Sequence, residues 1–506
     1  MKSRSEYAMK NAIVTIIMQI LKNFFSFINQ TVFIYILGRE YLGINSLFSE
    51  ILTMLSFAEL GIGNAIIFSM YKPLAENNIE KIKSLMKLYE KAYRIIGVVV
   101  ALFGVGIIPF LKYIINDISY IKENIILIYC IYLFNSIISY FFVYKKSLII
   151  ADQKNYIVDI YQQIFYSIQV ILQIIILILT RKFILYLIVV AIMTLLNNYW
   201  VANKADKMYP YIKEKTINPL ENGEKLEIFN NIKALLVYKI GGIILDSTDS
   251  IFISSIINVI TVGLYSNYKL VINVFRTAGN QIINSIMSSI GNLNATAIDK
   301  QKEKIFNELF YITIWFFGFI SVGMCVCLSE LVKVWLGKDY LISYTSVFVA
   351  VVYYYIQNMH YPCYMYRTTA GLFIYGKFAP LFCAIINIIL DIILGIKLGL
   401  TGILLASVIA RLITTEVIDP FLVYKKVFHS SVKYYFFMYF KFTFLVVVNG
   451  LFCYAITGTV KIEGIGGVLV KILIVTVVFN FLFLLETFKL NSFQSILIRI
   501  KILLKK

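Results

Sequence analysis

The sequence has few of the residues on which soluble and catalytic proteins depend. Only 15% of its 506 residues are charged, whereas soluble proteins average about 25%. Its 2 histidines, His360 and His429, are too few for a convincing metal or proton-relay cluster, and His360 is expected to pack as a buried histidine. The 6 cysteines lie in apolar stretches without metal-ligand spacing, so we expect buried free thiols. We therefore predict no metal site and no cofactor other than a coupling ion.

Most of the sequence consists of long runs of apolar residues. Hydrophobic residues make up 60% of the chain and aromatic residues 16%. Runs of about 20 apolar residues cross a membrane as helices, so we predict an all-α polytopic membrane protein with about fourteen transmembrane helices. The basic N-terminus lacks a cleavage site of small residues, so the first span is expected to be uncleaved. The predicted spans are 11–37, 42–70, 93–112, 122–144, 156–180, 183–202, 234–257, 261–290, 307–328, 341–366, 375–397, 400–424, 436–458 and 464–487.

The formal net charge of +19 is explained by membrane orientation and not by nucleic-acid binding. Lysine and arginine gather in alternate short loops and do not form a basic domain. Cytoplasmic loops of membrane proteins are enriched in these residues. The alternation predicts an even number of spans with both termini in the cytoplasm, and no nucleic-acid partner.

The spans are predicted to form two six-helix bundles, 1–202 and 234–424, joined by a cytoplasmic loop at 203–233. That loop contains Pro210 and Pro219. Helices within 425–487 follow, and the basic tail 488–506 predicts either an interfacial helix on membrane lipids or a stop-transfer flank. Residues 42–48 align with 262–268 at an offset of 220, which indicates that the bundles are related by a parallel pseudo-repeat.

Polar side chains repeat at helical spacing in the middle of three apolar spans. Each set lies on one face of its helix, and lipid cannot satisfy such groups. We therefore predict that the three faces line a common hydrated cavity. The stripes are Thr15, Gln19, Lys22, Ser26 and Asn29 in the first span; Gln162, Tyr166, Gln169 and Gln173 in the fifth; and Lys269, Asn273, Arg276, Asn280 and Asn284 in the eighth.

The charges within the membrane favour an anionic ligand. Lys22, Lys269 and Arg276 lie near the middle of apolar spans, where a charge costs about 2.5–3.5 kcal/mol, and lysine and arginine are suited to phosphate. The alternative is that these cations pair with acids inside the membrane. Arg411 either joins the phosphate site or pairs with Asp391.

Acidic residues form a second set of candidates. They bind a coupling Na⁺ or proton, or they neutralise the cavity cations. The set comprises Glu59, Asp246, Asp249 and Asp391.

Two stretches of sequence resemble a known family. The first contains Gly38-Arg39-Glu40-Tyr41-Leu42-Gly43, Leu47-Phe48 and Ala58-Glu59-Leu60-Gly61-Ile62-Gly63-Asn64-Ala65; the second contains Lys239-Ile240-Gly241-Gly242, Ser247-Thr248-Asp249 and Thr261-Val262-Gly263-Leu264-Tyr265. These motifs resemble the Wzx-type polysaccharide repeat-unit flippases of the multidrug/oligosaccharidyl-lipid/polysaccharide (MOP) superfamily.

The resemblance implies a transporter and not an enzyme. Such a protein flips oligosaccharide repeat units on undecaprenyl pyrophosphate from the inner to the outer leaflet of a bacterial cytoplasmic membrane, by alternating access. The products are capsule, exopolysaccharide or O-antigen-type polysaccharide. Lys22, Lys269 and Arg276 match positions where the related lipid II flippases keep cavity charges, although two of the three are lysine here. The implied partners are membrane lipids, a polysaccharide polymerase and chain-length machinery, with the transporter itself a monomer.

Four other classes compete with this interpretation. A lipid II flippase should have a cavity richer in arginine, and a multidrug cation antiporter should have an acidic or apolar one. A polymerase or membrane glycosyltransferase should have a large outward loop, which hydropathy does not predict. A channel should have a filter sequence, and nothing in the sequence resembles one.

Overall fold

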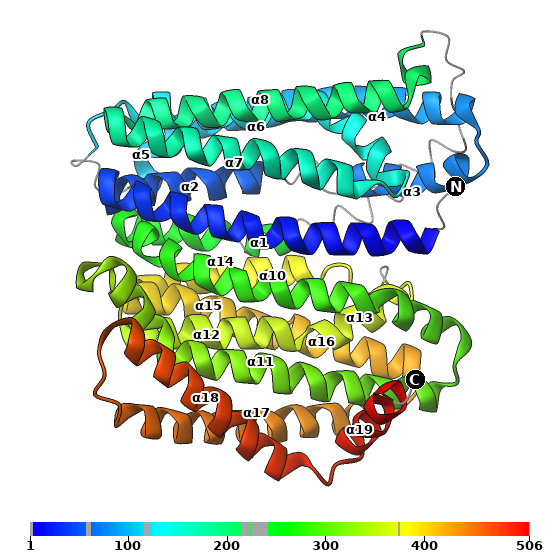
Figure 1. The fold of residues 1–506 in the computed structure, drawn as a ribbon, viewed down its shortest axis with the longest axis vertical. Coiled ribbons are helices and arrows are strands. Elements are labelled where there is room, and N and C mark those ends of the chain that lie inside the picture. Colours follow the sequence, from blue (N-terminus) through cyan, green and yellow to red (C-terminus); the bar gives the residue numbers. More distant parts are fainter. Residues whose placement is uncertain are drawn as a thin grey trace. The chain divides into compact units, whose positions relative to one another are not determined.

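The chain folds almost entirely into helices, which Figure 1 shows running side by side within each half of the sequence. The computed structural model describes residues 4–56, 62–115, 121–214, 220, 223, 241–245, 247–372 and 375–504. In these ranges, 10 helices are long and apolar enough to cross a membrane. The chain is therefore an all-α polytopic membrane protein, as predicted. It divides into two compact units, Met1–Gly263 and Leu264–Lys506.

The first unit is a bundle in which α1 runs parallel to α7 and α6 parallel to α8, since Asn11 and Thr15 bond residues 156 and 159 in the same order and Ser139 and Lys145 contact residues 198 and 206 in the same order. Helix α1 packs on α7, α7 on α8, α8 on α6 and α6 on α4, while α2 and α3 also pack on α6. Its helices are α1 (Arg4–Leu37), α2 (Arg39–Leu55), α3 (Ile62–Ala75), α4 (Ile79–Ile107), α5 (Leu111–Ile114), α6 (Ile125–Ala151), α7 (Asn155–Thr180) and α8 (Phe183–Met208), with a π-helical turn at Ile253–Ile257. Helix α10 (Val259–Thr296) begins in this unit and continues into the second.

The second unit is organised around α11, which contacts α12, α17, α18 and α19, while α15 packs on α12 and α14. Its helices after α10 are α11 (Asp299–Leu336), α12 (Tyr344–Met359), α13 (Tyr361–Thr369), α14 (Ala379–Leu398), α15 (Leu400–Ile413), α16 (Thr415–Val423), α17 (Lys433–Gly458), α18 (Gly464–Thr487) and α19 (Asn491–Leu504). Large apolar side chains such as Phe440, Phe444 and Leu473 are exposed on α17 and α18, as lipid-facing surfaces require.

The helices agree closely with the spans predicted from hydropathy. The seventh span, 234–257, is described at 241–245 and 247–257, which are helical, and every other predicted span falls on helices. The two predicted boundaries between spans that are separated by only a few residues are both observed. Arg181 ends α7 in the left-handed conformation, and Gly399, with φ 59° and ψ −137°, joins α14 to α15 in a conformation that glycine adopts without strain. Most of the predicted loop 203–233 is not described, so the predicted domain boundaries stay predictions.

Two spans predicted as single helices are instead broken. The tenth is divided at His360, between α12 and α13, where Pro362 near the start of α13 suits a new helix beginning. The twelfth is divided at Thr414, whose φ of −118° and ψ of −89° end α15 before α16 begins. Hydropathy does not detect such breaks because the apolar character continues across them.

Candidate functional site

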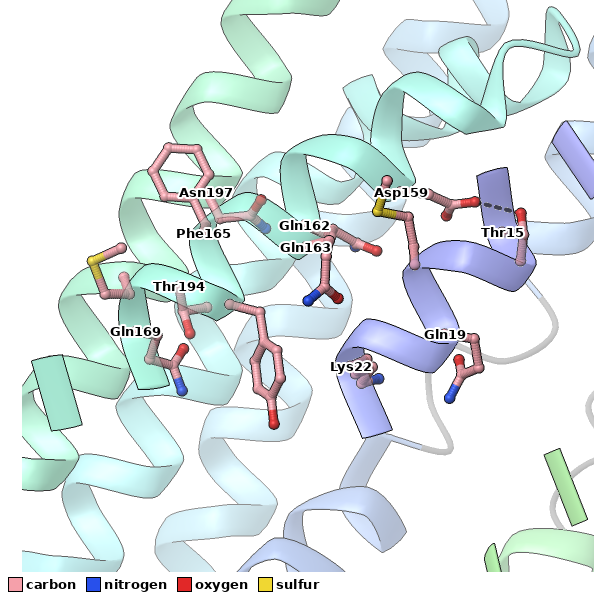
Figure 2. Close-up of a pocket in the computed structure, with 13 residues that line it drawn as sticks. Thr15, Gln19, Lys22, Asp159, Gln162, Gln163, Phe165, Gln169, Thr194 and Asn197 are labelled. Atoms are coloured by element: carbon pink, nitrogen blue, oxygen red, sulfur yellow. Dashed lines mark hydrogen bonds between the residues drawn. The ribbon is translucent and has the colours of Figure 1, made fainter. Parts of the chain in front are cut away.

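Polar stripes on α1 and α7 face a common cavity in the first unit. The cavity has a volume of about 330 Å³ and receives Thr15, Gln19 and Lys22 from α1. Figure 2 shows these side chains beside those of α7, with residues of α8 completing the wall. The other lining residues are Met18, Asp159, Gln162, Gln163, Phe165, Tyr166, Gln169, Met193, Thr194 and Asn197. The predicted meeting of the first and fifth spans is thus observed.

This cavity contains an acidic residue, Asp159, as well as the basic Lys22. Asp159 accepts hydrogen bonds from the Thr15 hydroxyl at 2.6 Å and the Asn155 amide at 3.0 Å. Lys22 lies seven residues beyond Thr15 on the same helix, a rise of about 10 Å. Lys22 is exposed and makes no ion pair with any acid in the described part of the chain. An anion in the cavity would therefore lie toward Lys22 and away from Asp159.

A second cavity adjoins the first and is lined by hydroxyls and amides. Its volume is about 350 Å³, and no charged residue is among the described residues that line it. Gln169 lines both cavities. The remaining lining residues are Asn45, Ser49, Leu52, Thr53, Ser56, Tyr132, Asn135, Ser136, Ser139, Gln173, Tyr186, Leu187 and Val190. The two cavities together form a polar tract with positive charge in one part only.

Several polar atoms in the second cavity have unused hydrogen-bonding capacity. The amide nitrogen of Gln173, which is 1% exposed, and the side-chain oxygen of Asn135 have no hydrogen-bond partner among the described residues. Asn29 reaches the cavity wall by donating to the Tyr186 hydroxyl at 2.8 Å. A donor and an acceptor left free at one site suit a ligand hydroxyl, which both donates and accepts.

The walls contributed by α2 and α6 were not predicted from the sequence. Asn45, Ser49 and Thr53 follow one another at four-residue steps on α2. Asn135 and Ser139 do the same on α6. The helical spacing was present in the sequence, but serine and threonine are inconspicuous in apolar spans because their hydroxyls can bond to the preceding turn. Ser49 and Thr53 do bond to it.

The third predicted stripe lies on α10 in the second unit. Lys269, Arg276 and Asn280 are half-buried and Asn273 is exposed. The side-chain oxygen of Asn280 is buried without a hydrogen-bond partner among the described residues. The side chain of Asn284 lies outside the described residues. The predicted convergence of this stripe with those on α1 and α7 stays a prediction.

The remaining candidates are distributed over α14 and α15. The Arg411 guanidinium lies over the Tyr353 ring, 5.5 Å from its centre. Asp391, at 0% exposure, accepts a hydrogen bond of 3.2 Å from Asn387, which also bonds Ser407 at 3.1 Å. Asp391 is thus held in a buried polar group on adjoining helices.

The other predicted acids are only partly described. Asp249 is buried, at 9% exposure, while Asp246 and Glu59 lie outside the described residues. The 6 cysteines are all free thiols, as predicted, but only four are buried, since Cys130 is exposed and Cys325 is half-buried.

The fold and the polar cavities define a class of protein: a multi-pass membrane protein with polar internal cavities. No protein-family model matches the chain, and no curated protein matches it. Among solved structures, the inward closed conformation of lipid II flippase MurJ is similar with a TM-score of 0.62 at 16% identity, covering 94% of this chain and 98% of MurJ.

Two multidrug transporters are also similar. An inward-facing multidrug resistance MATE family transporter of the MOP superfamily has a TM-score of 0.63 at 13% identity, covering 81% of this chain and 97% of that one. A point mutant of the Vibrio cholerae MATE transporter VcmN has a TM-score of 0.58 at 12% identity, covering 85% of this chain and 98% of that one. The chain therefore has the fold of the MOP-superfamily transporters.

Proposed function

We propose that this protein flips undecaprenyl-pyrophosphate-linked oligosaccharide repeat units across the membrane by alternating access. The observation that carries the proposal is the pair of adjoining cavities in the first unit. One contains Lys22 and the other is polar without charge, and Gln169 lines both. A lipid-linked sugar has the same two parts, an anionic diphosphate and a neutral glycan.

The physical chemistry of such a substrate requires these surfaces. Phosphate oxygens are strong acceptors that lysine satisfies with charge-assisted hydrogen bonds. Sugar hydroxyls need donors and acceptors, which the free amide nitrogen of Gln173 and the free amide oxygen of Asn135 supply. Leaving such groups unsatisfied in an apolar medium costs several kcal/mol each, so transfer through bare hydrocarbon is prohibitive. The polyprenyl tail needs no such surface and can remain in lipid.

A lipid II flippase and multidrug transporters are both among the similar structures, aligning with 94% and 81% of this chain in two cases. The charge of Lys22, which pairs with no acid in the described part of the chain, supports an anionic lipid-linked substrate over a cationic drug. Lipid II flipping is therefore the second candidate, and the composition of the accumulated glycan separates it from repeat-unit flipping. The transporter fold supports a non-enzymatic role.

Transport against a gradient needs an energy source, for which we propose cation coupling by Na⁺ or H⁺. Asp391 is fully buried and bonded to Asn387, with Ser407 next to them. Carboxylate, amide and hydroxyl oxygens are suitable ligands for a hard cation. Asp249 is the other described acid in this role, and Asp246 and Glu59 complete the proposed set.

The proposal also includes the location, oligomeric state and orientation of the protein. The protein acts as a monomer in the cytoplasmic membrane of a bacterium, with both termini in the cytoplasm. The basic loops support this orientation. Its product passes to a polysaccharide polymerase and chain-length machinery.

Mass spectrometry of lipid-linked intermediates in cells depleted of this protein tests the proposal. We expect complete single repeat units on undecaprenyl pyrophosphate to build up at the cytoplasmic face while surface polysaccharide disappears. Accumulation of lipid II instead would favour the second candidate. Truncated glycans would indicate a transferase, complete units at the outer face would indicate a polymerase, and an unchanged lipid pool would favour drug transport.

A further inference from the structure

The two broken helices of the second unit meet at a buried ionisable cluster. His360 lies at the break between α12 and α13, and Glu416 is the second residue of α16 after the break at Thr414. Helices α13 and α16 pack on each other. Helix breaks within a membrane protein are tolerated where they line a polar site, and in transporters they form ion sites.

The histidine ring is held between two carboxylates. Nδ1 of His360 lies 3.2 Å from Oε1 of Glu416, and Nε2 lies 3.0 Å from Oδ2 of Asp419. The three residues are 8%, 4% and 0% exposed. These are ion-pair distances and not hydrogen bonds, since Nδ1 of His360, Oε1 of Glu416 and Oδ2 of Asp419 have no hydrogen-bond partner among the described residues. Two carboxylates beside one ring stabilise a positive charge on it, so the arrangement favours the protonated ring.

The charges of the cluster balance only when the ring is protonated. Arg367, at 2% exposure, donates to Oδ1 of Asp419 and, at 3.0 Å, to the carbonyl oxygen of Tyr375. It compensates one carboxylate, so the second stays uncompensated unless His360 carries a proton. An uncompensated charge at such burial is strongly disfavoured.

The other titratable side chains that the structure describes around the cluster are a thiol and phenols, which are neutral at physiological pH. They are Cys363 on α13, Tyr424 after α16, and Tyr435 and Tyr439 on α17, all buried. A proton on His360 is thus the group that makes the site neutral.

The cluster is not a fully satisfied structural network. Neither oxygen of Glu416 accepts a hydrogen bond from a described residue, and the neighbouring hydroxyls of Tyr435 and Tyr439 have no hydrogen-bond partner there either. Purely structural buried networks satisfy nearly all their polar atoms. A buried carboxylate with free acceptor capacity suits a group that gains and loses a proton.

We propose that His360, Glu416 and Asp419 form a buried site that binds one exchangeable proton and holds α13 against α16. This site shares no residue with the cavities of the first unit or with the Asp391 group. The inference goes beyond the proposed function, since proton binding here requires no substrate.

Nuclear magnetic resonance of the ¹⁵N-histidine-labelled full-length protein in liposomes tests this directly, because the chain has only 2 histidines. His429 is exposed and lies 2.9 Å from Asp299, so His429→Gln assigns the spectrum and leaves His360 as the remaining signal. We expect two protonated ring nitrogens on His360 at neutral pH, and a reversible change to the neutral ring in alkaline buffer.

Variants of the two carboxylates distinguish a proton-binding site from a cluster that serves only in packing. Asp419→Asn and Glu416→Gln each remove one negative charge and should leave His360 neutral at neutral pH. A ring that is neutral with one fixed tautomer in the otherwise wild-type protein, from mildly acidic to alkaline pH, overturns the proposal. The wild-type spectrum suffices for this decision even where a variant fails to fold, and it does not depend on whether the protein transports lipid-linked sugars.

Discussion

Gly43 of α2 approaches Val259 of α10 so closely that a Cβ atom on the glycine would lie 2.0 Å from the valine carbonyl oxygen. The contact is reciprocal, since a Cβ on Gly263 would lie 2.5 Å from the carbonyl oxygen of Arg39. Gly43 and Gly263 also occupy equivalent positions in the repeat predicted at an offset of 220. The glycines aligned by sequence therefore lie at one helix crossing, where the backbones touch.

Substitution of Gly43 tests the importance of that crossing. Gly43→Ala places a methyl group against backbone that cannot rotate away, so we expect a loss of stability of about 1–3 kcal/mol, the usual range for overpacking. Thermal unfolding in detergent measures it. Gly106→Ala on α4 is the matched control because nothing lies within 4 Å of its Cβ position. Equal unfolding temperatures for both variants would contradict the prediction.

Removal of the three cations proposed to bind the diphosphate should impair export without preventing membrane insertion. Lys22→Ala, Lys269→Ala and Arg276→Ala each delete a charge proposed to bind the diphosphate. A hydrogen bond to a charged group contributes about 1.5–3 kcal/mol, which is about ten- to a hundredfold in affinity. Surface polysaccharide in cells with matched expression is the readout. Lys72→Ala is the control, because its side chain is 83% exposed and pairs with Glu76. Full surface polysaccharide in all three variants would exclude the anion site.

Binding of two lipids should separate recognition of sugar from recognition of phosphate. Undecaprenyl diphosphate and its N-acetylglucosamine-bearing form are the probes, with affinity measured by native mass spectrometry. Gln173→Leu and Asn135→Leu should weaken binding of the glycosylated lipid by about tenfold, as expected for the loss of one or two hydrogen bonds, and leave the bare lipid unaffected. Lys22→Ala should weaken both. Equal losses for both lipids in Gln173→Leu would argue against a separate sugar subsite.

The C-terminal helix should stabilise the second unit through Glu308. This carboxylate is 5% exposed. It accepts a hydrogen bond of 2.6 Å from the Ser495 hydroxyl and forms an ion pair at 3.1 Å with Arg499, both residues of α19. The double variant Ser495→Ala and Arg499→Ala leaves a buried acceptor unsatisfied, so we expect a loss of about 1–3 kcal/mol. Thermal unfolding of this variant is compared with that of Lys501→Ala, whose side chain is exposed on the same helix. No difference between them would show that α19 does not support the unit.

The helices and much of the first cavity could be predicted from the sequence because both depend on local periodicity. Apolar length identifies a span, and spacing places Gln19 and Lys22 on one face and Gln162 and Gln169 on another. The structure brings those faces together. The similar spacing on α2 and α6 was not predicted, because short hydroxyl side chains give a weaker signal.

The cluster at His360 could not be predicted in this way. Its partners Glu416 and Asp419 belong to another helix, and the breaks that bring them together follow from long-range packing and not from hydropathy. A lone histidine in an apolar span is usually a packing residue, and here it is buried between two carboxylates. Residues that act through distant partners are identified only once the fold is known.

The two adjoining cavities are formed largely by different helices, and this has an evolutionary consequence. The lysine of the polar tract, Lys22, comes from α1, while the uncharged cavity is built largely from α2 and α6. Under the proposed function, exchange of serine, threonine and asparagine on α2 and α6 would change which glycan is accepted and leave the phosphate contact intact. Related transporters could therefore acquire new sugars through a few substitutions of similar size, whereas Gln169, which borders both cavities, would resist change.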